Sequence, residues 1–455
     1  MTDCGKCGAE LPESARGWCT SSGVPLALDA GKWDLDTPAP KPLTERAGDL
    51  GKAPRRWARV RRRRLLALLI AVGVVVLAGT GVGGYLLASG NSPGQVQLFA
   101  VHPDGKTGFI DKTGKMVIQP QDFMAWGFQE GLALVILSNK SGDESGDKVG
   151  FIDTSGKFVI QPRPGSVTDF HEGLAHFDNG DDLGFIDKTG AYVFQAKGIS
   201  WAGDFSEGLA AVEQLVGDVR LFGYIDKTGK MAIQPQFGLA RDFSEGLASV
   251  CESEESDGAD YGYIDKTGAW VIAPQFSYAG PFTEGLAAVC IPDKSDPNLP
   301  GTWGFIGKSG AWAVQPKFVS ADAFSEGLAT VGETDASGVT KYGYVDKTGA
   351  WAIEPTFAGA EAFSQGLAAA QTADGSYAWG YIDRKGGWVV RPRFGWADSF
   401  APGGLAMVSL GKPVPPDRVR YSSPAQLWSD PETIRLRFGD MAYIDKTGKI
   451  VWQNQ

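Results

Sequence analysis

One short unit recurs along most of this chain, and the repetition constrains the fold more than any other feature. The unit is clearest at residues 261–290, YGYIDKTGAWVIAPQFSYAGPFTEGLAAVC. Its first signature, G-[YF]-I-D-K-T-G-x-[aromatic]-x-[IV]-x-P, has nine copies. They begin at Gly108, Gly150, Gly184, Gly223, Gly262, Gly304, Gly343, Gly380 and, with Ala in place of Gly, at Ala442. A second signature, F-[ST]-E-G-L-A-x-V, follows each of the first eight copies. Self-similarity of this density predicts a tandem repeat architecture.

Each copy is predicted to form three short strands and no helix. Residues 261–264 and 270–272 are aromatic and β-branched, as half-buried strands require. Between them, Asp265 can bond the backbone two residues on, and Gly268 can take the positive φ of a turn with a bulge, so the two strands form a hairpin. Pro274 cannot donate to a ladder and is predicted to end the second strand. Residues 286–289 form the third strand.

The two ends of the repeat array match each other, which predicts a ring. Copy nine has the hairpin but no third strand after it, whereas residues 98–101, Leu-Phe-Ala-Val, precede copy one and match the third strand. A blade shared between the termini would close a propeller-like ring and remove exposed sheet edges. Nine three-stranded units exceed the usual number of blades, so an open β-repeat spiral is the alternative.

The tandem pattern resembles the bacterial WG-repeat family, also called KWG repeats. The resemblance runs from about residue 98 to residue 452, although the Trp-Gly pair itself is present only at Trp303-Gly304 and Trp379-Gly380. It implies an all-β repeat scaffold, often on surface or secreted proteins, with no general catalytic activity. It does not supply a ligand.

The N-terminal residues 1–23 resemble a degenerate zinc ribbon. Cys4, Cys7 and Cys19 provide three of the four thiolates of a tetrahedral site, but Ser22 stands where the fourth should be. The interpretations left open are a zinc site that borrows a ligand and a vestigial or disordered tail.

Residues 24–64 are rich in Pro and Gly, lack periodicity and end in a basic run, so they are predicted to be a disordered basic linker.

Residues 65–88 are uncharged and predominantly apolar, and long enough to cross a bilayer as a helix. Seven arginines precede this stretch, at 55, 56, 59 and 61–64. The positive-inside rule therefore predicts a single-pass protein with a cytoplasmic N-terminus and extracytoplasmic repeats at residues 95–455. Gly79 and Gly83 form a Gly-x-x-x-Gly motif that could pair two such helices in a homodimer.

Charge separates the two sides of the predicted membrane. There are 13 Lys and Arg against 8 Asp and Glu before Leu65, and 30 against 45 from there on. The acidic repeats argue against nucleic acid as a partner, because phosphate binding needs basic patches.

Cys251 and Cys290 take equivalent positions in neighbouring copies. A disulfide between them is one interpretation and two separate, half-buried thiols the other.

The sequence gives no sign of an enzyme. No nucleophile elbow, zincin motif or P-loop is present, and the repeated Asp is explained by turn chemistry. No cofactor is expected apart from zinc at the N-terminal segment. The aromatic series at Phe158, Tyr192, Trp270, Trp312, Trp351 and Trp388 fits either a sugar-stacking row or packing between repeats.

One connection is much longer than the others. The turn residues Asp383 and Asp445 are 62 residues apart, against 34 to 42 for the other steps. The insertion, residues 411–440, is predicted to recognise a partner, because loops of this length are often functional and Arg, Tyr and Trp dominate binding hot spots. Its candidate binding residues are Arg418, Arg420, Tyr421, Trp428, Arg435 and Arg437.

These features together predict a membrane-anchored binding or scaffold protein at the bacterial cell surface, whose partner is a protein or a cell-wall glycan. Two alternatives stay open. A transmembrane sensor would use the zinc-ribbon-like tail on the cytoplasmic side, and a glycan-processing enzyme would need a carboxylate pair in a cleft.

Overall fold

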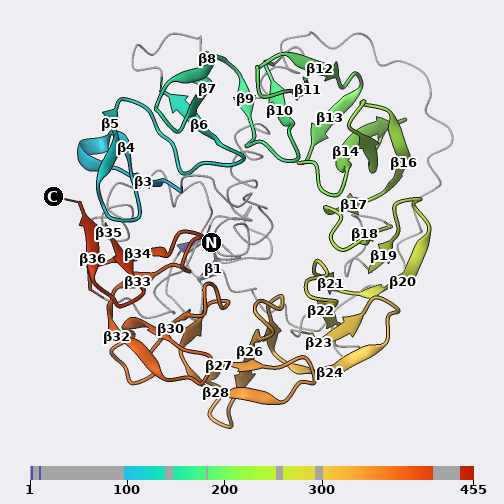
Figure 1. Cartoon of the computed structure of the whole chain (residues 1–455). Coiled ribbons are helices and arrows are strands. Elements are labelled where there is room, and N and C mark those ends of the chain that lie inside the picture. Colours follow the sequence, from blue (N-terminus) through green and yellow to red (C-terminus); the bar gives the residue numbers. More distant parts are fainter. Residues whose placement is uncertain are drawn as a thin grey trace. The chain divides into compact units, whose positions relative to one another are not determined.

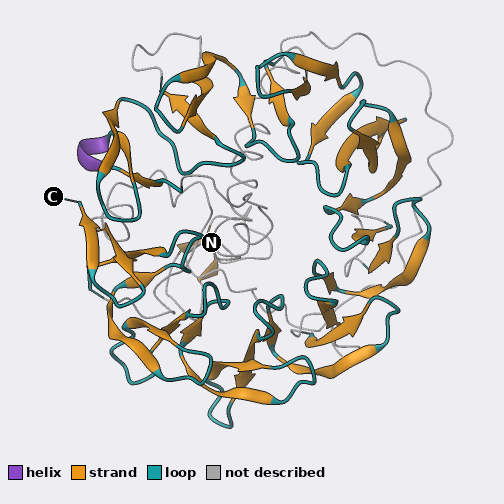
Figure 2. Ribbon diagram, in the orientation of Figure 1, coloured by secondary structure: helices purple, strands orange, loops and turns teal. Residues whose placement is uncertain are grey.

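The chain divides into two compact units, Met1–Arg63 and Arg64–Gln455. The computed structural model describes residues 97–138, 147–180, 183–252, 260–292, 301–412 and 441–454, and in the first unit the antiparallel pair β1 (Thr2–Asp3) and β2 (Glu10–Leu11). The described part of the second unit consists of antiparallel sheets with a single 3-10 turn, η1 (Pro103–Gly105) (Figure 1; Figure 2). There are nine sheets among these residues, so the predicted all-β repeat domain is confirmed.

The strands fall in chain order into nine blades of a propeller, with the following bounds. Blade 1 holds β3 (Phe99–Val101), β4 (Thr107–Ile110) and β5 (Met116–Gln121); blade 2 holds β6 (Leu132–Leu137), β7 (Lys148–Asp153) and β8 (Phe158–Pro164); blade 3 holds β9 (Ser166–Val167), β10 (Ala175–Asp178), β11 (Leu183–Ile186) and β12 (Tyr192–Gln195); blade 4 holds β13 (Ile199–Ala202), β14 (Leu209–Val216), β15 (Val219–Asp226) and β16 (Met231–Phe237); blade 5 holds β17 (Leu239–Ala240), β18 (Ala248–Cys251), β19 (Tyr261–Ile264) and β20 (Trp270–Phe276). Blade 6 holds β21 (Tyr278–Ala279), β22 (Leu286–Ile291), β23 (Thr302–Gly307) and β24 (Trp312–Phe318); blade 7 holds β25 (Ser320–Ala321), β26 (Ala329–Thr334), β27 (Thr340–Val345) and β28 (Trp351–Phe357); blade 8 holds β29 (Gly359–Ala360), β30 (Ala368–Gln371), β31 (Trp379–Ile382) and β32 (Trp388–Phe394); blade 9 holds β33 (Trp396–Ala397), β34 (Leu405–Ser409), β35 (Met441–Asp445) and β36 (Ile450–Gln453).

The D-K-T-G turn forms as its residues predict. In blade 5 the Thr267 N–H and hydroxyl both donate to Asp265 Oδ1, at 2.8 and 2.6 Å, and Gly268 has φ +84°. Gly307 replaces the aspartate in blade 6, where Ser309 Oγ accepts the Ala311 N–H instead, at a longer 3.4 Å. The hairpin is therefore a local property of each copy.

The prediction that proline ends the outer strand is wrong. β20 continues through Pro274 to Phe276, because the proline lies in a bulge where no ladder hydrogen bond is needed: Tyr261 pairs with Phe276 and Tyr263 with Ile272. The outer strand crowds the glycine opposite it. A Cβ on Gly262 would lie 2.5 Å from the Ile272 carbonyl oxygen, so the glycine of the repeat is a steric requirement.

Copy nine differs from the others at the glycine position and in its outer strand. Its outer strand has no proline, and Ala442 pairs with Gln453 and Tyr443 with Trp452 without a register shift between them. Ala442 stands here where the other copies have glycine.

Blade composition corrects the predicted closure. The strand that ends one copy pairs with the hairpin of the next copy, as β18 does with β19, and a short inner strand such as β17 adds a fourth that the sequence analysis missed. β3, which contains most of residues 98–101, pairs with β4 of copy one and not with copy nine. The ring is confirmed, but no blade is shared between its ends.

Apolar side chains of neighbouring blades form the cores of the ring. Between blades 5 and 6, Tyr263 and Ile272 pack with Phe282, Val289 and Ile306, all nearly inaccessible to solvent. An equivalent cluster joins the first and last blades, where Phe99 and Tyr443 meet edge to face at 5.5 Å between ring centroids.

The outer aromatic row packs between blades as well. Trp270, Trp312, Trp351 and Trp388 each meet a phenylalanine of the preceding blade nearly at right angles, with ring centroids 5.7 to 6.2 Å apart. This supports the packing interpretation for these four tryptophans over the sugar-stacking one.

The antiparallel topology gives the ring two faces and an inner edge. The D-K-T-G turns and the E-G turns between first and second strands lie at one end of each blade, here called the turn face. The connections of variable length between second and third strands lie at the other end, the loop face. In Figure 1, β17 and β21 lie toward the centre of the ring and β20 and β24 toward the outside, so the first strand of each blade defines the inner edge.

Candidate functional site

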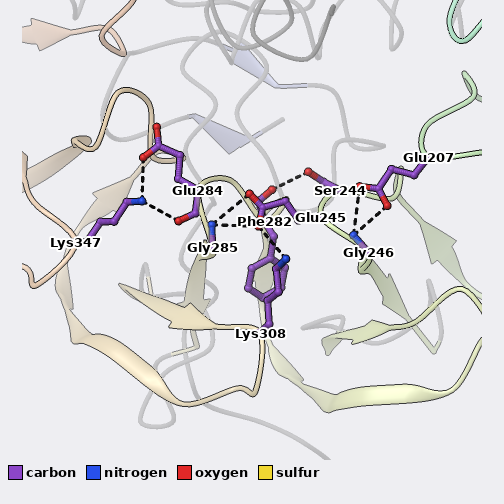
Figure 3. A network of polar contacts seen from close by, with 9 residues as sticks. All are labelled: Glu207, Ser244, Glu245, Gly246, Phe282, Glu284, Gly285, Lys308 and Lys347. Atoms are coloured by element: carbon purple, nitrogen blue, oxygen red, sulfur yellow. Dashed lines mark hydrogen bonds and ion pairs between the residues drawn. The ribbon is translucent and has the colours of Figure 1, made fainter.

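The E-G turn on the turn face joins neighbouring blades. In blade 5, Glu245 sends its carboxylate to blade 6, where it accepts the Gly285 N–H at 3.1 and 3.2 Å and the Lys308 ammonium at 3.0 Å (Figure 3). Desolvation acts to raise the pKa of Glu245, but these two donors hold it below its ordinary value. We call this arrangement the clasp.

The clasp recurs around most of the ring in one direction, from each blade to the next. Five glutamates accept both the glycine N–H and the lysine: Glu130 with Gly173 and Lys188, Glu172 with Gly208 and Lys227, Glu207 with Gly246 and Lys266, Glu245 with Gly285 and Lys308, and Glu284 with Gly327 and Lys347. In a sixth, Glu326 accepts the Gly366 N–H alone. Gln365 continues the series through its main-chain oxygen, which accepts Lys446 Nζ at 2.7 Å.

The glutamate of the clasp occupies a strained backbone position. Glu245 has φ +51° and Gly246 has φ +89°, with paired backbone hydrogen bonds between Ser244 and Leu247, which together make a type I′ turn. Such turns favour Asn-Gly, and the left-handed region costs an ordinary side chain about 1–2 kcal/mol. Glutamate is retained there because its longer side chain reaches the next blade.

Two further hydrogen bonds follow the same direction. The Ser244 hydroxyl donates to the Phe282 carbonyl oxygen at 2.7 Å (Figure 3), and the buried Tyr263 hydroxyl donates to the Gly280 carbonyl oxygen at 2.7 Å. The serine and the tyrosine are replaced in some copies, for example by Thr283 and Phe305, but where they are present each helps to hold one blade against the next.

The variable positions of the repeat gather at the inner edge. The two residues before the phenylalanine of F-[ST]-E-G change from blade to blade, whereas the phenylalanine itself is present in all eight. From blade 2 to blade 9 these pairs are Trp126-Gly127, Thr168-Asp169, Gly203-Asp204, Arg241-Asp242, Gly280-Pro281, Asp322-Ala323, Glu361-Ala362 and Asp398-Ser399. The first residue of the pair extends the inner strand, as the Asp322 N–H does by donating to the Thr330 carbonyl oxygen.

Six of these eight blades carry a carboxylate at the inner edge, in two groups. In blades 7 to 9, desolvation raises the pKa of Asp322 and of Asp398 to about 6. Desolvation, with the neighbouring Asp322 and Asp398 carboxylates, raises the pKa of Glu361 to about 7. None of these three carboxylates forms an ion pair within the described residues, in contrast to the clasp glutamates.

The second group, in blades 3 to 5, contains basic side chains as well as carboxylates. Desolvation and the Asp204 carboxylate raise the pKa of Asp169 and of Asp242 to about 6, although His171 opposes the shift in both. His171 Nε2 lies 3.4 Å from Asp204 Oδ2. The Arg241 guanidinium lies over the Tyr278 ring, 5.0 Å from its centroid. Asp242 and Asp322 keep exposed surface, so a partner can reach them, and solvent screening limits what their pKa shifts contribute to stability.

Blade 2 adds an exposed aromatic to this edge. The side chain of Trp126 is 53% exposed and that of the nearby Met124 45% exposed, on the short inner segment that bridges to β6. The inner edge therefore combines carboxylates with apolar surface, while the scaffold positions beside them stay the same.

Comparison with known proteins agrees with this architecture. The model of the family described as "WG containing repeat" matches residues 108–140, 150–180, 184–214, 222–254, 261–294, 303–333, 342–376 and 379–412. The chain belongs to the WG-repeat family. The ninth WG repeat, from Ala442, lies beyond these matches. A search of curated proteins finds no significant match.

Solved structures similar to the WG-repeat ring have low identity. A crystal structure titled as the eukaryotic initiation factor shares 11% identity with a TM-score of 0.39, covering 80% of this chain and 90% of that one. The β-propeller domain of the Trilobed protease from Pyrococcus furiosus shares 9% with a TM-score of 0.31, covering 59% and 93%. The tricorn protease shares 11% with a TM-score of 0.33, covering 78% and 42%.

Several predicted site residues lie outside the described residues. These are Cys4, Cys7 and Cys19 of the zinc-ribbon-like segment, the predicted span 65–88 with Gly79 and Gly83, and Arg418, Arg420, Tyr421, Trp428, Arg435 and Arg437 of the insertion. Among the described residues no helix is long and apolar enough to cross a membrane, and no group of three or more acidic, His or Cys side chains is arranged to hold a metal ion.

The two repeat cysteines are present as thiols and are not bridged. Cys251 lies in β18 of blade 5, between Leu239 and Tyr261 in the sheet, and Cys290 takes the same place in β22 of blade 6. Both are buried within their own sheets, so the disulfide interpretation is wrong.

The sequence analysis missed the clasp and the inner edge of the WG repeats. The signal for the clasp was glutamate before glycine at a two-residue turn where asparagine would be expected. The signal for the inner edge was the change of residue type at two positions inside an otherwise constant signature. Both signals gain their meaning only from the strand pairing, which places these positions against the next blade and at the centre of the ring.

Proposed function

We propose that this WG-repeat chain is a membrane-anchored binding protein, whose propeller acts as a rigid scaffold outside the cytoplasm and recognises a partner through its variable surfaces. The observation that supports this most is the separation of constant from variable positions. The glutamate and glycine of the clasp are kept in most copies, whereas the variable residues gather at the inner edge and on the loop face. A scaffold that displays different side chains on one repeated backbone is suited to binding.

The charge of the inner edge favours a basic partner. Asp322, Glu361 and Asp398 crowd like charges together, and no basic residue in the described part of the ring forms an ion pair with them; cationic groups of a partner would supply that charge. Trp126 adds a surface on which an apolar or cationic group can pack. A basic segment of a protein fits these features better than nucleic acid does, because the edge would repel phosphates.

The loop face supports a second contact through the insertion at residues 411–440. Ser409 and Met441, which flank it, are paired in the ladder between β34 and β35, so the insertion leaves and re-enters blade 9 on the loop face. We propose that its arginines, Arg418, Arg420, Arg435 and Arg437, contact an acidic partner such as an anionic cell-wall polymer or the acidic loops of a second copy. Anchoring by residues 65–88 would hold both surfaces near the membrane.

The test is capture of partners by the full-length protein in mild detergent, followed by quantitative binding with variants. The variant D322N/E361Q/D398N should weaken binding of a basic partner at least tenfold. The control D218N/E333Q/E354Q removes the same charge from exposed positions away from the inner edge and should leave binding unchanged. Replacing the four arginines with serine tests the insertion separately. Unaltered binding by both test variants would refute the proposal.

A further inference from the structure

The clasp lacks its carboxylate in one sector of the turn face. Gln365 in blade 8 and Gly403 in blade 9 stand where the E-G turns of blades 2 to 7 carry glutamate. The lysines that such glutamates would contact are still present. Lys446 of blade 9 donates to the main-chain oxygen of Gln365, and within the described residues no carboxylate forms an ion pair with Lys446 or with Lys112 of blade 1.

The charge of the turn face changes sign between this sector and the rest of the ring. In blades 2 to 7, the five-residue D-K-T-G turns and the E-G turns carry seven basic residues against five aspartates and six glutamates. In blades 8, 9 and 1 the same turns carry three aspartates and six basic residues, which we call the basic sector: Arg384, Lys385, Lys446, Lys449, Lys112 and Lys115.

The basic sector is continuous across three neighbouring blades. Blades 8 and 9 share one apolar cluster and blades 9 and 1 another, and the three blades follow one another around the ring (Figure 1). Five of the six side chains are exposed, and Lys446 is half-buried. Because salt screens charges more than about 8 Å apart, a molecule that approaches these turns meets their local positive charge and not the acidic average of the ring.

The described chain enters the ring at the same sector. Phe99 pairs with Ile110, which directly precedes the turn at residues 111–115, so β3 begins at the turn face. A Cβ on Gly403 would lie 2.8 Å from Gln97 Cγ, so Gln97 lies beside the turn of blade 9. Residues 89–96 separate Gln97 from the predicted membrane span, and a chain of this length reaches at most about 30 Å.

We propose that the basic sector docks on the anionic phospholipid headgroups of the membrane that holds the anchor. Lysine and arginine side chains are attracted to a negatively charged lipid surface, and the short connection keeps these residues close to it. Docking would turn the turn face toward the bilayer and leave the loop face, with the insertion at residues 411–440, directed away from it. This inference rests on the proposed anchoring and adds an orientation to it.

Crosslinking to lipids tests the docking with the full-length protein in nanodiscs. The photoreactive residue p-benzoylphenylalanine takes the place of Thr113 in the turn of blade 1, a position that also accepts Lys385 in blade 8. The same replacement of Thr267 in blade 5 probes the acidic part of the same face. Mass spectrometry measures the lipid adducts.

The expected result depends on the charge of the lipid. Adducts at position 113 should be at least fivefold more abundant in discs of equimolar phosphatidylcholine and phosphatidylglycerol than in discs of phosphatidylcholine alone. Adducts at position 267 should be the same in both. The increase at position 113 should disappear in about 1 M salt, where charges are screened within about 3 Å.

Two variants test the residues themselves. K112Q/K115Q/K446Q/K449Q should abolish the increase at position 113, whereas the matched control K106Q/K148Q/K197Q/K412Q, which removes four exposed lysines from the loop face, should retain it. Q365E supplies the carboxylate that Lys446 lacks, as the clasp glutamates do in other blades, and should lower the increase about twofold.

The outcomes separate the docking from the anchoring. Equal adducts at position 113 in the two kinds of disc, or an equal increase at positions 113 and 267, would overturn the docking and leave the anchor in place. A full-length chain that enters discs of neither composition would refute the anchoring, and the docking with it.

Discussion

Replacing Glu245 with glycine separates the two opposing contributions of the clasp residue. At φ +51°, glycine relieves about 1–2 kcal/mol of backbone strain but costs about 0.4–1 kcal/mol through the greater freedom of the unfolded chain. The backbone effect alone is therefore a gain of about 0–1 kcal/mol. Against it stand the lost hydrogen bond from Gly285 and the lost ion pair with Lys308.

The lost contacts outweigh that gain. A hydrogen bond to a charged group contributes about 1.5–3 kcal/mol and an exposed ion pair about 0–1 kcal/mol. Because the Glu245 side chain is 32% exposed, screening brings the total toward the lower end, about 1.5–2 kcal/mol. We expect E245G to be destabilised by about 1 kcal/mol, and E245A, which keeps the strain, by about 2 kcal/mol.

Gln365 provides the control within the same chain. It has the same backbone conformation, φ +56°, but an exposed side chain, and Lys446 contacts only its main-chain oxygen. Q365G should therefore be neutral or stabilising by up to about 1 kcal/mol. Urea unfolding followed by tryptophan fluorescence measures both variants. If E245G and Q365G differ by less than about 0.5 kcal/mol, the clasp does not stabilise the ring and the argument is refuted.

Three other predictions follow from the structure. G262A should destabilise blade 5 by about 1–3 kcal/mol, because its Cβ meets the Ile272 carbonyl oxygen, whereas A442G should cost only about 0.5–1 kcal/mol; comparable losses in urea unfolding would contradict the steric role of Gly262. The raised pKa values of Asp322, Glu361 and Asp398 mean that the folded ring holds protons that the unfolded chain releases, so stability should fall as pH rises from about 4 to about 7. D322N/E361Q/D398N should flatten that fall in the urea midpoint, and an unchanged slope would exclude these groups. A reporter fused after Gln455 should be active only if it works outside the cytoplasm; equal labelling of cysteines engineered at both termini by an impermeant reagent would contradict the proposed topology.

The sequence predicted the local structure of each copy better than the strand pairing and the contacts between copies. The turn from Asp265 to Gly268 depends on neighbouring residues in the chain, and it formed as expected. The bulge at Pro274 could not be foreseen, because it depends on pairing with the strand that contains Gly262. A proline in isolation indicates the end of a strand, but in the sheet it marks where the partner strand must carry glycine.

The candidate site was harder to predict than the fold. Glu245 contacts residues 40 and 63 positions further along the chain, and nothing local marks such distant partners. The ring closure was predicted from the match between residues 98–101 and the repeated third strand. The match was real, but it reflects the pairing of β3 with its own copy, since the strand before each first signature belongs to the same blade as the hairpin that follows it.

The one-way direction of the clasp gives each inner blade a donor side and an acceptor side. Blade 5 receives the carboxylate of Glu207 on one side and presents that of Glu245 on the other, so it would match a second copy of itself as well as it matches blade 6. Duplication of the DNA encoding one such blade would thus add a compatible neighbour at once, with no new contact to evolve. Within the described residues, blades 1, 2, 8 and 9 depart from this rule, so rings of different size could arise within the family by copying from the middle.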